Sequence, residues 1–238
     1  VNDKGEVPLA VNLHWGFKAV ASELSALTGL HAKAANDANI AALGEAWKGA
    51  AEGSKNVILV TLGTGVGGGI IVDGKIVSGH HGAGGEIGHA DVNHSELRPC
   101  NCGNHGCLEQ YTSATGIVRV ANDILEESTE DSKMRHVEKL SAKDVLDCYK
   151  EGDALAVRTM EKVGDVLGGA LAMFACVTDP EAIVIGGGVS KAGKILTDCI
   201  QKYYKKYAFS SCKNTPIILA SLGNDAGIYG AARMVIRD

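Results

Sequence analysis

Two runs of consecutive apolar residues stand out along the chain, NVILVTLG at 56–63 and EAIVIGGG at 181–188. Both runs are short, rich in β-branched residues and end in glycines, which is typical of buried strands. Around them, apolar residues recur at helical spacing over 17–27, 37–49, 112–127, 141–150, 153–177, 192–207 and 225–236. Because strands alternate with helices, the pattern predicts an α/β protein with a mixed sheet.

The polar stretch at 126–139, EESTEDSKMRHVEK, interrupts this pattern between two predicted helices. Its polarity makes it the best candidate for an exposed, mobile surface segment that carries no chemistry. Ser141 follows shortly afterwards and stands three residues before Asp144, which is the spacing of a helix capping box. We therefore expect the next helix to begin at this serine.

Composition bounds the size of the core and the range of partners. The chain has 238 residues, 45% of them hydrophobic, which suffices for one large domain or two modest lobes. No run approaches the roughly 18 apolar residues that a membrane span needs, and VNDKGEVPLAVN lacks the features of a signal peptide. A formal net charge of −5 argues against a nucleic-acid partner, which normally requires a basic face. We expect a cytoplasmic protein without membrane contact, in which the basic cluster of Lys202, Lys205 and Lys206 is the solvated side of a helix.

The glycine loop GTGVGG at 63–68 fits the G-x-G-x-x-G fingerprint of dinucleotide-binding proteins, so a dehydrogenase must be considered. That fingerprint requires a helix directly afterwards, whereas GIIVDGKIV predicts a β-hairpin with Asp73-Gly74 in its turn. A glycine loop between two strands can hold phosphate differently, through the amides of Gly63, Thr64 and Gly65 and the Thr64 hydroxyl. The alternative is a tight hairpin without a ligand.

A second glycine loop, IGGGVS at 185–190, leads from a predicted strand into a predicted helix. The N-terminus of a helix after a glycine turn suits a nucleotide phosphate. Alone, the triple glycine can equally indicate close packing of a strand on a helix. Two such loops in one chain favour an actin-like nucleotide clamp.

Three of the seven cysteines lie together in CNCGNHGC, at Cys100, Cys102 and Cys107. Thiolates at this spacing, in a chain bent by glycines, suit a tetrahedral zinc ion, and a closed structural site needs a fourth ligand. We favour His89 in GEIGH, with His94 and His105 as alternatives. A disulfide or free thiols are the competing interpretation, which an intracellular setting disfavours. We assign no role to the four scattered cysteines Cys148, Cys176, Cys199 and Cys212, which are expected to be small buried side chains.

Three carboxylates lie in chemically suggestive places: Asp37 in AANDANIAALGE, Glu86 in GAGGEIGH and Glu109 in GCLEQY. Alone, each is more often a solvated or capping residue. A zinc ion that folds the segment between His89 and Cys107 would bring Glu86 and Glu109 toward one place. Carboxylates can accept hydrogen bonds from several sugar hydroxyls, and one can act as a general base.

With these motifs the sequence resembles the ROK family of sugar kinases and repressors, most of all its bacterial glucokinases. The resemblance covers nearly the whole chain and is carried by NLHW, AANDAN, VTLGTGVGGGII, GAGGEIGH, CNCGNHGCLE, GDALA, IVIGGGVS and NDAGIYGAA. It implies an actin-like (ribonuclease H-like) fold of two lobes, with sugar and Mg-ATP meeting in the cleft between them. The implied activity is ATP-dependent phosphorylation of glucose at its 6-hydroxyl, with ATP, Mg²⁺ and a structural Zn²⁺ as cofactors.

The resemblance also assigns roles by position. Asp37 is the implied catalytic base, and the zinc ligands are His89, Cys100, Cys102 and Cys107. The residues implied to bind sugar are Asn36, Asp37, Glu86, His89 and Glu109. The residues implied to bind ATP are Gly63, Thr64 and Gly65 on the phosphate side and Gly187 and Gly188 on the adenosine side.

Two departures from the family pattern stand out. Family members open with a strand and a DxGGTxxK-type phosphate loop, which does not occur here, and His14 stands where glucokinases tend to carry glycine. We therefore expect a fragment whose residues 1–56 are the remainder of a small N-terminal lobe, joined by a C-terminal helix at 225–238, with a large lobe at 57–224. Competing functions are a sugar-responsive repressor, a kinase of N-acetylhexosamines or fructose, a dehydrogenase and a structural zinc protein. A homodimer is expected by resemblance.

Overall fold

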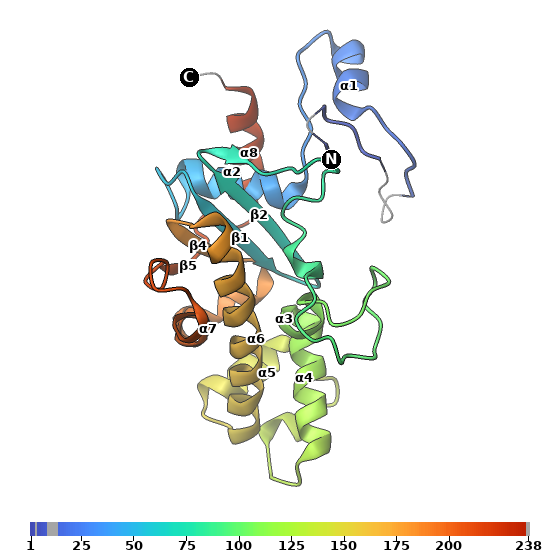
Figure 1. The fold of residues 1–238 in the computed structure, drawn as a ribbon. Coiled ribbons are helices and arrows are strands. Elements are labelled where there is room, and N and C mark those ends of the chain that lie inside the picture. The colour runs from blue at the N-terminus through green and yellow to red at the C-terminus, as the bar shows by residue number, and fades with distance from the viewer. Residues whose placement is uncertain (3, 9–13, 237–238) are drawn as a thin grey trace.

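The computed structural model describes residues 1–2, 4–8 and 14–236 (Figure 1). Residues 12 and 13 of the NLHW motif and residues 237–238 of the expected C-terminal helix lie outside this described part. At the centre of the described residues is a five-stranded sheet of order β3-β2-β1-β4-β5. Its strands are β1 (Val57–Leu62), β2 (Val66–Val72), β3 (Lys75–Ile76), β4 (Ala182–Gly186) and β5 (Ile217–Leu219).

The pairing of these strands confirms the predicted mixed sheet. Strand β1 pairs antiparallel with β2 and parallel with β4, and β5 lies parallel to β4. Strands β2 and β3 form the predicted hairpin, with Asp73 and Gly74 in its turn at φ of 51° and 74°. Strand β5 was not predicted, because three residues are too few to show a periodic pattern.

Helices occupy the predicted segments with small shifts at their ends. The α-helices are α1 (Val20–Thr28), α2 (Asp37–Lys48), α3 (Glu109–Thr112), α4 (Ala114–Glu127), α5 (Ala142–Lys150), α6 (Ala154–Thr178), α7 (Lys194–Tyr207) and α8 (Ala226–Val235). Short 3-10 turns are η2 (Ile87–His89), η3 (Lys133–His136), η4 (Gly188–Ala192) and η5 (Gly223–Asp225).

Local chemistry explains where the helices begin. The predicted helix at 112–127 is divided at Ser113, whose extended backbone ends α3 and whose side chain caps α4 by accepting a hydrogen bond from the Gly116 amide. Helix α7 begins after Gly193, because the φ of 82° at this glycine is not helical. The predicted capping box of Ser141 and Asp144 is present at the start of α5.

Alternate residues of β1 face opposite sides of the sheet, and each side has its own core. Ile58, Val60 and Leu62 pack with helices α4 to α7 in the larger core. Val57 and Leu59 pack on the other side, mainly against alanines of α2. Helix α8 lies against α2 (Figure 1). The sheet is thus covered on both faces, which leaves the ends of its strands for a site.

Helix α2, which we assigned from the sequence to the small lobe, shares a core with β1, β2 and β4. Helix α1 lies apart from the sheet, beyond α2 (Figure 1). The division of the chain at residue 56 stays a prediction.

Most of residues 126–139 are exposed, as predicted, but the segment is also anchored to the core. Met134 in η3 is 1% exposed and belongs to the larger core. Arg135 donates hydrogen bonds to the carbonyls of Leu125 and Ser128, which ties the segment to the end of α4. The buried Met134 was not predicted, because one apolar residue in a polar stretch gives no periodic signal.

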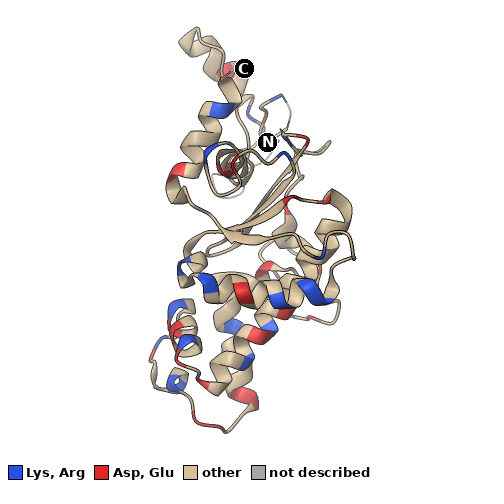
Figure 2. Cartoon of the chain, turned by 90° about the vertical axis from the view of Figure 1, so that its left-hand side faces the viewer, with Lys and Arg blue, Asp and Glu red and all other residues tan. Residues whose placement is uncertain are grey.

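Charged residues of both signs are interspersed along the helices on the side that Figure 2 shows. Lys202 and Lys206 on α7 form ion pairs with Glu161 and Asp165 on α6, at 2.8 and 3.2 Å between nitrogen and oxygen. The basic cluster is therefore a solvated helix face, as predicted, and the acidic residues of α6 offset its charge.

Candidate active site and metal cluster

The predicted base Asp37 is the first residue of α2 and opens onto a cavity of about 600 Å³. Asn36 caps the helix, and its Oδ1 accepts hydrogen bonds from the amides of Ala38 and Asn39 at 2.9 and 3.2 Å. The Asp37 carboxylate accepts from the Ala38 amide at 2.8 Å. A carboxylate at this end of a helix is favoured by the helix dipole. The cap thus fixes the direction in which Asp37 faces the cavity.

The same cavity brings together residues that are far apart in the sequence. Its lining includes Gly63 and Gly65 from the first glycine loop, Gly187 from the second, and Glu109 from α3. A second cavity, of about 510 Å³, shares Gly187 with the first and is also lined by Gly188. Both glycine loops and the predicted base therefore border two adjoining cavities at the ends of β1 and β4.

The first glycine loop is stabilised partly by its own hydrogen bonds. The Gly63 amide donates to the Gly65 carbonyl at 3.0 Å, so this amide is used within the loop. Thr64 is exposed, and its carbonyl accepts a hydrogen bond from the Thr115 hydroxyl at 3.0 Å. A Cβ at Gly65 would lie 2.3 Å from Glu109 Oε2, so a larger residue here would displace this carboxylate.

The second glycine loop also requires its glycine. Gly187 has a φ of 82°, and a Cβ there would lie 2.5 Å from the Leu62 carbonyl oxygen. The close approach of β4 to the end of β1 therefore depends on this residue. Gly187 therefore accounts for the packing interpretation of the triple glycine. The backbone of Gly188 lines the second cavity.

His89, Cys100, Cys102 and Cys107 form the only group of its kind in the part of the chain that is described, with ligand atoms all within 4.8 Å of one another. Cys100 Sγ lies 3.8 Å from His89 Nδ1, and Cys102 Sγ lies 3.6 Å from Cys107 Sγ. A tetrahedral zinc ion with bonds of about 2.1–2.3 Å would separate its ligands by about 3.5–3.8 Å. The donor set and its spacing therefore fit zinc.

The disulfide and the alternative ligand His94 fit less well than the predicted cluster. All seven cysteines are free, so no disulfide forms in this cluster. His94 Nδ1 instead contacts Asp91 Oδ2 at 2.7 Å. Burial raises the pKa of the Cys107 thiol to about 12. A thiolate at this position would need a cation beside it.

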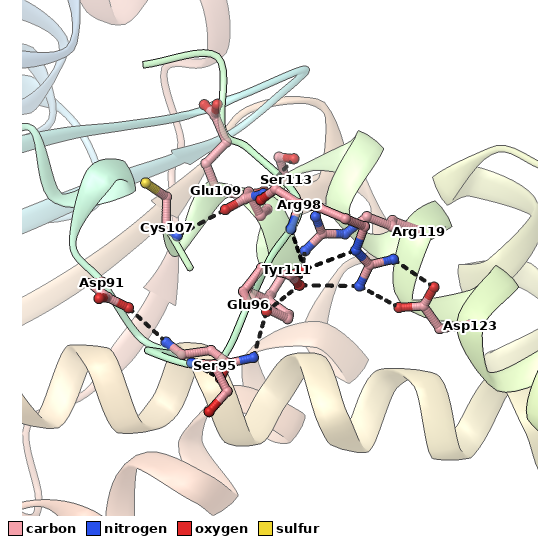
Figure 3. A network of polar contacts seen from close by, with 12 residues as sticks. Asp91, Ser95, Glu96, Arg98, Cys107, Glu109, Tyr111, Ser113, Arg119 and Asp123 are labelled. Carbon is pink, nitrogen blue, oxygen red and sulfur yellow. Dashed lines mark hydrogen bonds and ion pairs between the residues drawn. The ribbon is translucent and has the colours of Figure 1, made fainter. Parts of the chain in front are cut away.

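The loop that carries the cluster is attached to helix α4 by a polar network that the sequence did not reveal (Figure 3). Glu96, whose side chain is 7% exposed, accepts hydrogen bonds from Arg98 Nε at 3.0 Å, Tyr111 Oη at 2.7 Å and Arg119 Nη2 at 3.3 Å. Arg98 also donates two hydrogen bonds to Asp123 on α4. The hydrogen bond from Arg98 lowers the pKa of Glu96 well below its ordinary value.

Gln110 closes the same loop from inside. Its Oε1 accepts from the Cys107 amide at 3.0 Å, and its Nε2 donates to the Arg98 carbonyl at 2.9 Å. One buried side chain thus links the two ends of the cysteine segment.

Of the two carboxylates predicted near the zinc, Glu109 lies beside the cluster. Its Oε1 is 3.9 Å from Cys100 Sγ, while its Oε2 accepts the Val66 amide at 3.0 Å. Glu109 therefore connects the cysteine segment to the first glycine loop. Glu86 precedes η2 and is exposed, and it is not among the residues that line the cavity of Asp37.

Sequence reasoning missed several residues of the two cavities. Thr61 on β1 and Asn224 in η5 line both, and Glu45 on α2 lines the second. Glu45 and Asn224 stand inside the quoted motifs AANDANIAALGE and NDAGIYGAA. A helix position and a loop position carry no signal for a shared cavity until the fold brings them together.

Comparison with known proteins places this geometry in a family. A glucokinase of Halalkalibacterium halodurans is 44% identical over 237 residues, which are 98% of this chain and 72% of that protein. A ROK family glucokinase from Streptomyces griseus, solved in complex with glucose and AMPPNP, superimposes with a TM-score of 0.82 at 34% identity, covering 98% of this chain and 78% of that one. A ROK family transcriptional regulator, a homologue of the E. coli MLC protein, gives 0.84 at 31% identity, covering 97% and 58%.

These likenesses and the mixed sheet confirm the predicted actin-like fold. The model of the ROK family matches residues 1–238. The chain therefore belongs to the ROK family.

Proposed function

We propose that this protein is an ATP-dependent hexose kinase that phosphorylates glucose at its 6-hydroxyl. The observation that carries the proposal is the cavity in which Asp37, both glycine loops and Glu109 meet. A carboxylate and two phosphate-holding loops around one space are what phosphoryl transfer to an alcohol requires. The 44% identity to a glucokinase favours glucose among the hexoses.

In the proposed reaction, the sugar 6-oxygen attacks the γ-phosphorus of ATP in line with the departing ADP oxygen. A bond forms between that oxygen and the phosphorus, and the bond from the phosphorus to the β,γ-bridging oxygen breaks. Asp37 accepts the proton of the hydroxyl as the new bond forms. Asn36 supports this role, because its cap holds the first turn of α2 and with it the direction of the Asp37 side chain.

On the sugar side, we assign Asn36, Glu86, His89 and Glu109 to the hydroxyls of glucose. His89 presents Nδ1 toward the thiols, so its other ring nitrogen remains for a hydroxyl. Glu109 faces the cluster with one oxygen and the glycine loop with the other. A sugar hydroxyl at Glu109 would therefore lie between the cysteine segment and the phosphates.

His89, Cys100, Cys102 and Cys107 would hold a structural zinc ion, as their spacing allows. When bound, the ion would supply no chemistry to the phosphate and would cross-link the segment that carries the sugar ligands. The polar network of Glu96 and the buried bridge of Gln110 also hold this segment.

For the nucleotide, we assign the phosphates of Mg-ATP to the loop of Gly63, Thr64 and Gly65, in which the Gly63 amide is already bonded to the Gly65 carbonyl. We assign the adenosine side to Gly187 and Gly188. The two cavities support this division, because they adjoin at Gly187. The phosphate chain would cross from the second cavity to the first, where Asp37 lies.

The test is Mg-ATP-dependent phosphorylation of glucose, N-acetylglucosamine, N-acetylmannosamine, fructose and allose, measured by ADP release. We expect turnover to be greatest with glucose. A higher turnover with another sugar would keep the proposed kinase activity but replace glucose as its proposed substrate. Sugar binding without phosphorylation of any hexose would overturn the kinase in favour of a sugar-responsive repressor.

None of the helices formed by the described residues has the length and apolarity that a membrane crossing requires. We further propose a cytoplasmic location and a homodimer. Gel filtration with light scattering tests the homodimer.

A further inference from the structure

Glu45 is a buried carboxylate that the proposed reaction does not use. It lies on α2, eight residues after Asp37, and its side chain is fully buried. Its Oε1 accepts hydrogen bonds from the amides of Ser221 and Leu222 at 3.1 and 2.9 Å. Its Oε2 accepts from the Ala50 amide at 2.8 Å, the Ser221 amide at 3.2 Å and the Ser221 hydroxyl at 3.4 Å.

A carboxylate without contact to water is costly unless its oxygens are fully hydrogen-bonded. Here the donors come from two segments: the turn after α2, and the stretch that starts at the last residue of β5. The second segment, residues 219–224, lines the nucleotide-side cavity at several positions together with Gly187 and Gly188. Glu45 therefore attaches one wall of that cavity to α2.

Just beyond this wall, helix α2 also packs closely against the start of α8. A Cβ at Gly44 would lie 2.1 Å from the Ala226 carbonyl oxygen, so α2 touches the start of α8. The wall at 219–224 is thus fixed at one point by the carboxylate and at the next by helix contact. Helix α2 thus holds this wall through Glu45, and the same helix has Asp37 in its first turn.

We infer that Glu45 is a positioning residue for the nucleotide, which sets the wall of residues 219–224 at the distance that adenosine requires from Gly187 and Gly188. The inference rests on the proposed function and deepens it. Glu45 itself contacts no substrate in this role and acts through the backbone that it holds.

Glu45→Gln is the sharpest variant, because it keeps the shape and replaces one oxygen with an NH₂ group. Whichever oxygen is replaced, at least two hydrogen bonds lose their acceptor and the new donor faces amide donors. A buried donor without an acceptor costs enough to displace the loop. Glu52→Gln is the matched control, because Glu52 is exposed and bonds only to Lys48 among the contacts of its side chain that the structure shows.

The experiment measures the dissociation constants of Mg-AMPPNP and of glucose by calorimetry in the wild type and both variants. We expect Glu45→Gln to weaken AMPPNP binding roughly tenfold or more and to change glucose binding by less than about twofold. Glu52→Gln should match the wild type for both ligands. Unchanged AMPPNP affinity in Glu45→Gln, or an equal loss of both affinities, would overturn the inference.

Ser221→Ala reports on the same contact from the loop side if Glu45→Gln does not fold. It removes one hydroxyl donor and keeps every amide, so AMPPNP affinity should fall by about two- to threefold with glucose affinity constant. Equal affinities in Ser221→Ala and the wild type would count against the positioning role. A wild type that binds neither ligand would instead sink the proposed function, which distinguishes the two failures.

Discussion

The two sides of the proposed site are built in different ways. The nucleotide side rests on β1 and β4, whose apolar residues are almost fully buried, and on α2, which packs against them. On the sugar side, residues 78–108 form little regular structure beyond the short turn η2, and polar contacts and the thiol cluster hold them. Apolar packing secures the first side regardless of ligands. The second should depend on its metal and on a few charged side chains.

The largest expected effect is that of Asp37→Asn, which removes the proposed base from the nucleotide-side helix. We expect kcat to fall by about 10²- to 10⁴-fold, because an amide cannot accept the hydroxyl proton. Glucose affinity should stay close to that of the wild type, because an asparagine keeps a hydrogen-bonding side chain. Steady-state kinetics with glucose calorimetry measures both, and an unchanged kcat would remove Asp37 from the mechanism.

The second prediction separates the two sides. Cys102→Ser removes one ligand of the cluster, so zinc affinity should fall by at least about tenfold and glucose affinity should fall with it. AMPPNP affinity should not change, because the glycine loops rest on the sheet. Metal analysis and calorimetry test this. The control is Cys176→Ser on α6, where the thiol is exposed and not buried as predicted. Retention of both zinc and glucose binding by Cys102→Ser would contradict the structural-zinc proposal.

The third prediction concerns the polar network of the sugar side. Glu96→Gln should lower the free energy of unfolding by about 2 kcal/mol, because Arg98 and Arg119 lose a nearly buried charged partner. Glu126→Gln, at an exposed position of α4, should change it little. Urea unfolding of both variants measures the difference, and equal stabilities would show that the network contributes nothing.

The same network predicts how the stability contribution of Glu96 changes with pH. The pKa of Glu96 is lowered in the folded state, chiefly by the hydrogen bond from Arg98. Its contribution to stability is therefore present above the ordinary carboxyl pKa of 4.5 and lost as the pH falls below it toward the folded pKa. The stability difference between wild type and Glu96→Gln should shrink over that range. A difference that grows on acidification would contradict this assignment.

The smallest expected effect is at the capping box of α5, which lies outside both sides of the site. Ser141→Ala should cost about 1 kcal/mol of stability and leave both ligand affinities unchanged. A change in glucose or AMPPNP affinity would mean that the two sides are coupled through the larger core.

Much of the fold followed from the sequence, because β1, β4 and the long helices have strong periodic patterns. The misses have local causes. Ser113 ends one helix and caps the next within a single residue, and β5 is too short to show a period. Met134 was expected outside because its neighbours are polar, whereas one methionine is enough to dock η3 on the core.

Some residues of the site could likewise be predicted from the sequence, and others could not. The thiol cluster was predictable because three of its four ligands lie within eight residues, and His89 stands in a recognisable motif. Glu45, Glu96 and Gln110 were not, because their partners are chosen by tertiary contacts with loops that the sequence does not pair with them.

The most direct test of the account is to titrate glucose and Mg-AMPPNP into the purified protein before and after a chelator removes its zinc. We expect the zinc-loaded protein to bind both ligands, and we expect zinc removal to weaken glucose binding while AMPPNP affinity stays unchanged. Equal glucose affinity in the two forms, or loss of both ligands together, would contradict the claim that the metal supports the sugar side alone.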